Sequence, residues 1–401
     1  MIDLFQLAWR HLLHHRGRTL VLVLCLTVAL VLPWITRTLA NLWQDGLLAR
    51  AEATPLVIGA AGSRFDLVLH VLNFQTDPPG TFAQAEREAV VQSGHARVIP
   101  LHVRFRARGW PVVGTTLDYF EFRNLEVAQG RGLIRLGDCV VGAEAARELG
   151  LQPGDFLRTD RTGVFDLAGG QPLELRVNGV LGGNGSADDR AVFVDLHTAW
   201  VIEGIGHGHD DVGQVDGETG EGGDGSGGVV LEREPGHVVA GPALRTHQRI
   251  TDDNIGSFHF HGDPSGYPLT ALIALPADER ATTLLLGRYA AGDSRHQAQQ
   301  PPQVAAELIG MVARMKHWFD LQQGLLALVA GLLAGLVLWL SVRLRRGELR
   351  TMAHLGCARG TIVIMLAMEL ALLAALALAA AWAVNRLVAG LAADWVRALA
   401  G

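Results

Sequence analysis

Histidine and aspartate side chains with the chemistry of metal ligands gather in two stretches of the sequence. The stretch GHGHDD contains His207, His209, Asp210 and Asp211, and the stretch HFHGD contains His259, His261 and Asp263. Imidazole nitrogens and carboxylate oxygens are ligands that zinc accepts. In an extended strand His259 and His261 lie on one face because side chains alternate, while Phe258 and Phe260 pack on the other. The two stretches predict a zinc site, and solvent-facing histidines that bind no metal are the alternative.

No catalytic set accompanies these histidines. The sequence has no H-E-x-x-H motif, so the general base that a zinc hydrolase needs is not identified. Neither glycine-rich stretch contains G-x-x-x-x-G-K-[ST], and the only lysine of the chain is Lys316. We therefore predict no catalytic residue, no covalently bound cofactor and no ATP hydrolysis by this chain alone.

Three long apolar segments predict how this chemistry is positioned. The chain has 401 residues, 49% of them hydrophobic, and the apolar runs cover residues 19–36, 321–342 and 361–384. A helix needs about 20 apolar residues to cross a bilayer with its backbone hydrogen bonds satisfied internally. We predict three spanning helices, and the first apolar run is too long to be a cleaved signal peptide.

Arginines predict the orientation of these helices. Arg10, Arg16 and Arg18 precede the first span, and several arginines lie between the second and third. Positive charge near helix ends favours the cytoplasmic side. We therefore expect a cytoplasmic amphipathic segment at 1–18, a first span with a stalk at 19–52, a stalk and second span at 304–342, a cytoplasmic loop at 343–360, a third span at 361–384 and an outer-side tail at 385–401.

The region between the first two spans, residues 53–303, is predicted to be an extracytoplasmic domain of mixed α and β structure. Residues 95–114 and 173–181 are rich in β-branched or alternating residues, and residues 144–149 favour a short helix. Residues 277–289 favour another helix, and residues 297–303 read as a polar hinge. Residues 203–228 are so rich in glycine and acid that a flexible loop is expected.

The cytoplasmic loop contains the most specific motif of the sequence. RRGELRTMAHLGCARGTIVIMLAMEL (residues 345–370) resembles the loop between the second and third spans of MacB/FtsX-type ABC transporter permeases. The resemblance implies that a short helix here docks on the ATPase, through Arg345, Arg346, Glu348, Leu355, Gly356, Arg359 and Gly360. An ordinary positive-inside loop is the alternative. Glu369 lies inside the third span, where a structural pairing is favoured over transport chemistry.

Two further features match this family. The segment at 130–159 (GRGLIRLGDCVVGAEAARELGLQPGDFLRT), followed by LRVNGVL at 175–181, is similar to the family's periplasmic domain. The order of one span, a large outer domain and then further spans also matches. The family has four spans in this unit, whereas three are predicted here. Either the fourth span is missing, or residues 387–400 form a short amphipathic helix at the outer surface.

The resemblance implies a membrane subunit of an ABC transporter in the bacterial inner membrane. Its implied partners are a separate cytoplasmic ATPase, on which alone ATP binds, and a second permease copy in a dimer. The histidine-rich stretches resemble a subgroup associated with zinc-regulated, histidine-rich periplasmic proteins, so a periplasmic metal-binding or substrate protein is a further expected partner. No nucleic-acid signature is present. A membrane-anchored metal-dependent hydrolase and a histidine-rich metal-sensing scaffold remain alternatives.

Overall fold

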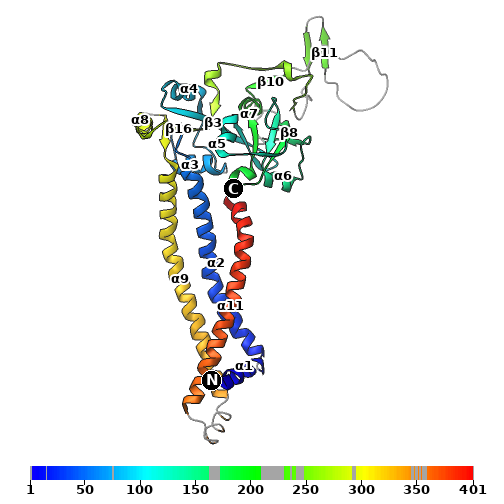
Figure 1. Ribbon diagram of the computed structural model, residues 1–401. Helices are drawn as coiled ribbons and strands as arrows, with labels where there is room; N and C mark the ends of the chain where they lie inside the picture. The colour runs from blue at the N-terminus through cyan, green and yellow to red at the C-terminus, as the bar shows by residue number, and fades with distance from the viewer. Residues whose placement is uncertain are drawn as a thin grey trace, which may run out of the picture. The chain divides into compact units, whose positions relative to one another are not determined.

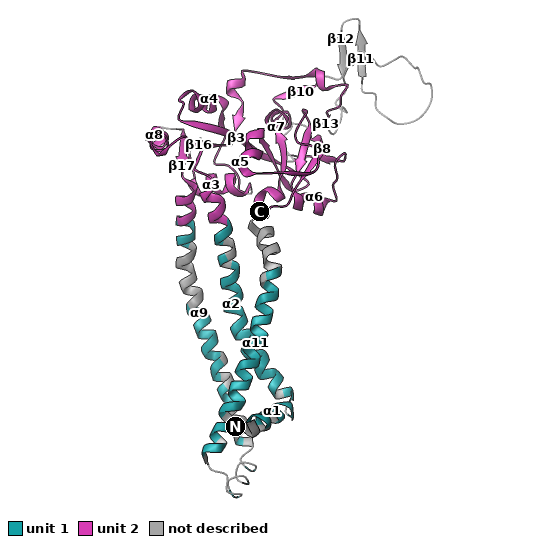
Figure 2. Cartoon of the chain, viewed as in Figure 1, with its two compact units in different colours: residues 1–46, 307–400 teal, residues 47–306, 401 magenta. Residues whose placement is uncertain are grey.

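The structure is a computed structural model that describes residues 2–14, 16–74, 76–161, 172–208, 230–234, 237–240, 248–290, 295–344, 347, 351, 354 and 359–400. The chain divides into two compact units, coloured separately in Figure 2, and its elements are labelled in Figure 1. The first unit comprises residues 1–46 and 307–400. The second comprises residues 47–306, and corresponds to the predicted outer domain.

The second unit is built on a mixed sheet that has eleven strands within the described residues. Its path runs β13-β8-β6-β9-β4-β3-β16-β1-β17, and both β5 and β7 pair with β8. The pairings of β8 with β6 and of β4 with β9 are parallel, whereas the other half of the sheet is antiparallel. The strands are β1 (Leu56–Ala60), β3 (Ala96–Ala107), β4 (Trp110–Thr115), β5 (Val127–Gly130), β6 (Asp138–Val141), β7 (Phe156–Arg158), β8 (Leu173–Leu181), β9 (Val192–Asp195), β13 (Gln248–Arg249), β16 (Ala271–Pro276) and β17 (His296–Gln299).

Both faces of this sheet are covered, because its strands carry apolar residues at successive positions. Val57 and Ile273 belong to one core cluster, whereas their neighbours Leu56 and Leu272 belong to another. The first face packs against α3 (Arg64–Asn73), α5 (Leu117–Arg123) and the short helix η1 (Ala187–Arg190). The second face packs against α4 (Gln84–Gln92), α6 (Ala143–Leu149), α7 (Leu196–Glu203) and α8 (Glu279–Ala290).

Three small two-stranded sheets complete the described part of this unit. They are β10 (Gly206–Gly208) with β14 (Phe258–Phe260), β11 (Val230–Glu234) with β12 (His237–Ala240), and β15 (Pro268–Leu269) with β2 (Phe82–Ala83). Two more short helices, η2 (Ile255–Ser257) and η3 (Pro264–Gly266), flank β14. The predicted flexible loop lies mostly outside the described residues, as residues 209–229 do.

Most of the predicted elements of the outer domain are present. The strand predicted at 173–181 is β8, and the helices predicted at 144–149 and 277–289 are α6 and α8. The prediction of a hinge at 297–303 is wrong: residues 296–299 form β17, which pairs with β1 at the sheet edge. Edge pairing through the backbone places few demands on side chains, so a polar segment is accepted there. Two prolines at 301 and 302 then begin the next helix, where a missing N–H costs nothing.

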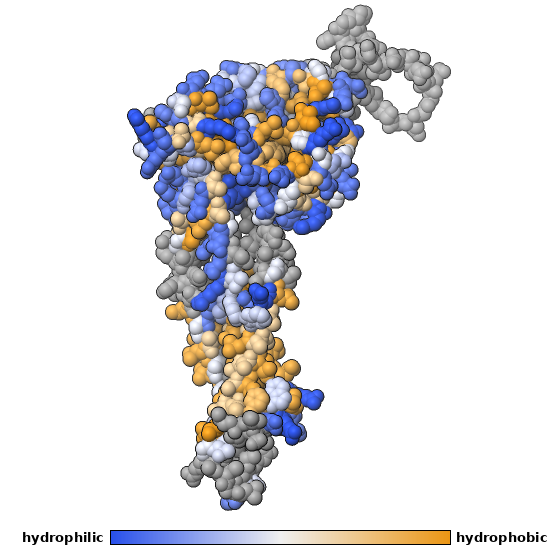
Figure 3. Space-filling view, viewed as in Figure 1, coloured by the Kyte–Doolittle hydropathy of each residue, from blue (hydrophilic) through white to orange (hydrophobic). Residues whose placement is uncertain are grey.

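In the first unit the structure describes four helices: α1 (Ile2–His14), α2 (Arg16–Glu52), α9 (Pro301–Leu344) and α11 (Arg359–Ala400), of which α2 and α9 continue into the second unit. Among the described residues, Thr19–Glu52 and Val363–Val388 are long and apolar enough to cross a membrane. Leu20, Leu24 and Val28 are more than half exposed on α2, and the apolar surface is visible in Figure 3. Lipid is the environment that favours such exposure. The second predicted span, 321–342, lies within the continuous helix α9.

The tail after the third span does not form the separate short helix that was one of its two alternatives. Instead, α11 runs unbroken from Arg359 to Ala400. Most of these residues are alanine, leucine and other strong helix formers, and no proline interrupts them. The helix therefore continues past Asp394 and Arg397, the two charges that had suggested a change of environment.

Candidate functional site

The predicted ATPase-docking residues lie mostly outside the described part of the chain. This applies to Arg345, Arg346, Glu348, Leu355 and Gly356. Arg359 and Gly360 are described, and they form the first turn of α11. The docking role of this loop stays a prediction.

The predicted intramembrane carboxylate is buried. Glu369 lies on α11 with 3% of its surface exposed. On the same helix, Leu373 packs in a small apolar cluster with Leu12 of α1 and Leu22 of α2. A carboxylate inside an apolar helix bundle is costly unless other groups compensate its charge. Burial is compatible with the structural role proposed for Glu369, and that role stays a prediction.

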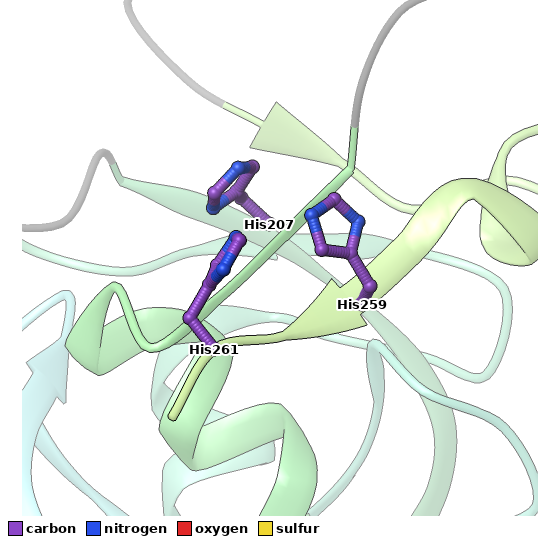
Figure 4. A group of neighbouring side chains, drawn as sticks. All are labelled: His207, His259 and His261. Carbon is purple, nitrogen blue, oxygen red and sulfur yellow. The ribbon is translucent and has the colours of Figure 1, made fainter. Parts of the chain in front are cut away.

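Three of the predicted metal ligands come together on the β10–β14 hairpin. The antiparallel register places His207 directly opposite His259, and His261 follows β14 on the same face as His259. The ring centroids of the three histidines are 4.7 to 4.9 Å apart. Each ring offers one nitrogen, and these nitrogens all lie within 4.8 Å of one another. Figure 4 shows the three rings around one small space. We call these residues the histidine trio.

The other predicted ligands are not part of the trio. His209, Asp210 and Asp211 lie outside the described residues. Asp263 is exposed and caps η3 by accepting a hydrogen bond from the backbone N–H of Ser265 at 3.0 Å. That bond lowers the pKa of Asp263. Among the described residues, no carboxylate belongs to the group of neighbouring ligand atoms formed by the trio. The hydrolase alternative needs a general base there, and the described part of the group supplies none.

Aromatic packing on the reverse face holds the hairpin against the domain. The rings of Phe258 and Phe260 pack against core clusters of the sheet. The two rings lie against the two glycines of β10, which leave room for them. A Cβ on Gly206 would lie 2.7 Å from the Phe260 ring, and a Cβ on Gly208 would lie 2.6 Å from the Phe258 ring. The alternation predicted from the HFHGD stretch is therefore present, with phenylalanines on the core side and histidines on the other.

A hydrogen bond from a buried histidine stabilises the element that leads into β10. Glu203, the last residue of α7, accepts a hydrogen bond from Nε2 of the fully buried His102 at 2.8 Å. It also pairs with Arg104. Burial alone would raise the pKa of Glu203, but the His102 hydrogen bond and the charges of His102 and Arg104 outweigh it and lower the pKa. The fold thus fixes the chain four residues before the trio begins.

A second charged cluster, which the sequence did not reveal, lies where α2 enters the outer domain. Arg50, in the last turn of α2, makes two hydrogen bonds to the carboxylate of Asp188, at 2.7 and 2.9 Å. The hydroxyl of Tyr119 donates to the same carboxylate at 2.7 Å and accepts from Arg50 at 3.1 Å. The side chains of Arg50 and Asp188 are only 10% and 1% exposed. We call these three residues the arginine anchor.

The arginine anchor is completed by three neighbouring side chains. Ser186 caps η1 and donates to Asp188 at 2.9 Å. Arg123 donates to the hydroxyl of Thr54, which in turn donates to the carbonyl of Arg50 at 2.9 Å. Burial would raise the pKa of Asp188, but the Arg50 charge and hydrogen bonds prevail and lower it to about 2. The partners of Arg50 lie 69 and 138 residues away along the chain, so no local motif could indicate the cluster.

Comparison with known proteins identifies the outer domain. Residues 54–224 match the family model of the MacB-like periplasmic core domain. This match confirms the resemblance to MacB/FtsX-type permeases over that part of the chain. No curated protein matches the chain significantly.

Two solved structures also show similarity, at TM-scores below 0.5. One is the extracellular domain of the noncanonic ABC-type transporter YknZ from Gram-positive bacteria, with TM-score 0.31 and 12% identity, covering 61% of this chain and 98% of that chain. The other is a domain of a protein described as a permease from Porphyromonas gingivalis, with TM-score 0.26 and 9% identity, covering 61% and 86%.

Proposed function

We propose that this chain is the membrane subunit of a MacB/FtsX-type ABC transporter, in which ATP hydrolysis by a separate cytoplasmic subunit changes the conformation of the outer domain. The observation that carries the proposal is the MacB-like periplasmic core domain at 54–224, adjoined by a helix long and apolar enough to cross a membrane. The docking loop at 343–360 would receive the ATPase, and a second copy of the chain would complete the transporter.

The arginine anchor supports a mechanical form of this function. Movement of a spanning helix reaches a folded domain only if the helix end is held firmly in that domain. Arg50 belongs to the apolar helix α2, and its guanidinium is held by a bidentate, buried carboxylate. Bidentate arginine–carboxylate pairs fix orientation as well as distance. Tilt or rotation of α2 would therefore pull on η1 and α5, the elements that carry Asp188 and Tyr119.

Association with an ATPase tests the first half of the proposal. The full chain is purified in mild detergent from its native membrane, and copurifying proteins are identified and assayed for ATP hydrolysis. Gly356→Trp and Arg359→Glu should each abolish copurification while membrane insertion is retained. His354→Ala, an exposed change in the same connector, is the matched control and should leave association intact. Equal recovery of the ATPase with all three variants would refute docking through this loop.

Hydrogen exchange tests the second half. In the purified complex, ATP should alter amide exchange in η1 and α5 of the outer domain, because the anchor would transmit movement of α2 to them. Asp188→Asn keeps the shape of the side chain but removes its charge, and should reduce this response while the ATPase stays bound. An identical nucleotide response in Asp188→Asn would show that force takes another route.

A further inference from the structure

We propose that His207, His259 and His261 form a three-histidine site for a divalent transition-metal ion of the zinc class, with a fourth coordination position that no described residue of this chain fills and that water or a ligand from another molecule can take. The site lies on the β10–β14 hairpin of the outer domain. It is independent of the proposed transporter function, since it needs neither the ATPase nor the spanning helices.

The spacing of the imidazole nitrogens suits one ion. A zinc–nitrogen bond is about 2.0–2.1 Å long, so two ligands of a tetrahedral ion lie about 3.3–3.5 Å apart. The three nitrogens are within 4.8 Å of one another without any ion. Rotations about the side-chain bonds can bring them closer to the bonding separation. Two of the histidines are half-buried and His261 is exposed, so an ion can enter and leave from one side.

One of the ligands is already held in the tautomer that metal binding requires. Nδ1 of His259 lies 3.1 Å from the backbone carbonyl of Ser257. A carbonyl oxygen only accepts, so Nδ1 is the donor in this bond, and Nε2 is the nitrogen that would coordinate an ion. Metal-bound histidines commonly donate their second ring nitrogen to a carbonyl in this way, which fixes the ring orientation.

The packing of the hairpin holds the histidines on one of its two faces. Gly206 and Gly208 flank His207 and leave room for the Phe260 and Phe258 rings, which pack toward the core. The backbone N–H of His261 donates to the carbonyl of Ile205 at 3.1 Å, which extends the pairing beyond β14. The three imidazoles thus project from a paired and packed backbone, and binding does not have to order it.

The ligand set selects the metal class. Three neutral imidazoles suit Zn²⁺, Cu²⁺ or Ni²⁺, whereas Mg²⁺ and Ca²⁺ require oxygen ligands. With three protein ligands, a tetrahedral ion keeps one open position. Such a site can exchange its ion or accept a fourth ligand from a second protein, which suits sensing or transfer of a metal at the outer surface.

Metal titration of the full chain tests the site. The tag-free protein in detergent is stripped with a chelator and titrated with Zn²⁺ against a chromophoric competitor, and with Co²⁺, whose visible absorption reports tetrahedral coordination. We expect one ion per chain with nitrogen coordination. His259→Ala and His261→Ala should each weaken binding by more than about 100-fold, beyond the 10–100-fold that loss of an outer-shell partner causes. Mg²⁺ and Ca²⁺ should not compete.

Two controls make the outcome decisive. His95→Ala removes an imidazole from the same domain but outside the trio, and should bind Zn²⁺ as the unaltered chain does. His261 is exposed and follows the strand, so His261→Ala should fold normally even if His259→Ala does not. Wild-type affinity in both variants, or equal losses in His95→Ala, would show that the histidine-rich chain binds metal only nonspecifically and would overturn the proposal.

Discussion

The arginine anchor and the histidine trio are two polar clusters of the same domain, and they solve opposite problems. The anchor joins three elements that are distant in sequence, and its charged groups are almost completely buried. The trio comes from one hairpin and faces solvent on one side. In the anchor, the charge of Arg50 is paired with the carboxylate of Asp188 inside the fold. In the trio, three imidazole nitrogens lie around a space that an ion can fill.

The comparison shows where rigidity and exchange are placed in this domain. A buried charge pair is costly to form, and breaking one side of it leaves the other uncompensated, so such a pair acts as a fixed joint. Half-exposed imidazoles contribute little to the stability of the fold. They can therefore bind or release an ion at little cost. The joint lies at the end of α2, and the exchangeable site lies on a peripheral hairpin of the outer domain. Four changes separate these roles.

Asp188→Ala should have the largest effect. It leaves the Arg50 guanidinium buried without its carboxylate, and such changes cost about 3–5 kcal/mol. Urea denaturation of the full chain in detergent, followed by exchange protection in β9 and α5, measures the loss for the outer domain. The double variant Arg50→Met with Asp188→Leu should recover most of it, since it removes both charges. If Asp188→Ala unfolds at the wild-type urea concentration, the anchor is not a structural joint.

Acid should weaken the anchor next. The folded-state pKa of Asp188 is about 2, below the ordinary 3.8, so its contribution is fully present above about pH 4 and is lost as the pH falls toward 2. The lowered pKa of Asp188 corresponds to about 2 kcal/mol of stability. Asp188→Asn should lack this component in a pH series of denaturation curves. An Asp188→Asn curve that follows the wild-type pH dependence would assign the effect to other carboxylates.

Gly208→Val should have a smaller effect on stability but a clear one on the trio. The added side chain meets the Phe258 ring, which is only partly buried and can shift, so the cost should be near 1 kcal/mol, the lower end for overpacking. The shift should misplace His207 and His259 and weaken Zn²⁺ binding without removal of a ligand. Gly256→Ala, where a Cβ meets nothing within 4 Å, is the control. Unchanged Zn²⁺ affinity in Gly208→Val would show that the metal site does not depend on the packing of the hairpin.

Arg97→Ala should have the smallest effect. Arg97 pairs with Asp118 and Glu121 on α5, but both partners and Arg97 itself are about half exposed or more. Surface pairs of this kind contribute about 0–1 kcal/mol and are screened by salt. The same denaturation assay, at low and high salt, should place this variant within error of the wild type at high salt. A loss as large as that of Asp188→Ala would remove the contrast between buried and exposed pairs.

Sequence patterns predicted the elements of the outer domain where one periodic signal acts alone. The alternation in residues 173–181 predicted β8, and the H-x-H spacing correctly placed His259 and His261 on one face. Predictions failed where a neighbour decides the structure. Residues 296–299 are polar and next to prolines, yet they form β17 because β1 offers a free edge to pair with.

The histidine trio and the arginine anchor also differ in how far the sequence could predict them. The histidines could be predicted as metal ligands from the sequence, because few residue types bind zinc and the H-x-H spacing is local. That His207 joins them, and that Asp263 does not, depends on the register of β10 with β14. The arginine anchor could not be predicted from the sequence. Arginine, tyrosine and aspartate are common residues, and only the fold buries these three together.

The amino-acid sequence by itself determined the apolar helices, the alternating strands and the candidate metal chemistry, because each depends on residues close together along the chain. The tertiary structure decided which histidines share a site, which carboxylate is a cap and where α2 is held. Those outcomes depend on pairing and burial between residues far apart in the chain, and burial is what turns a common charge pair into a fixed joint.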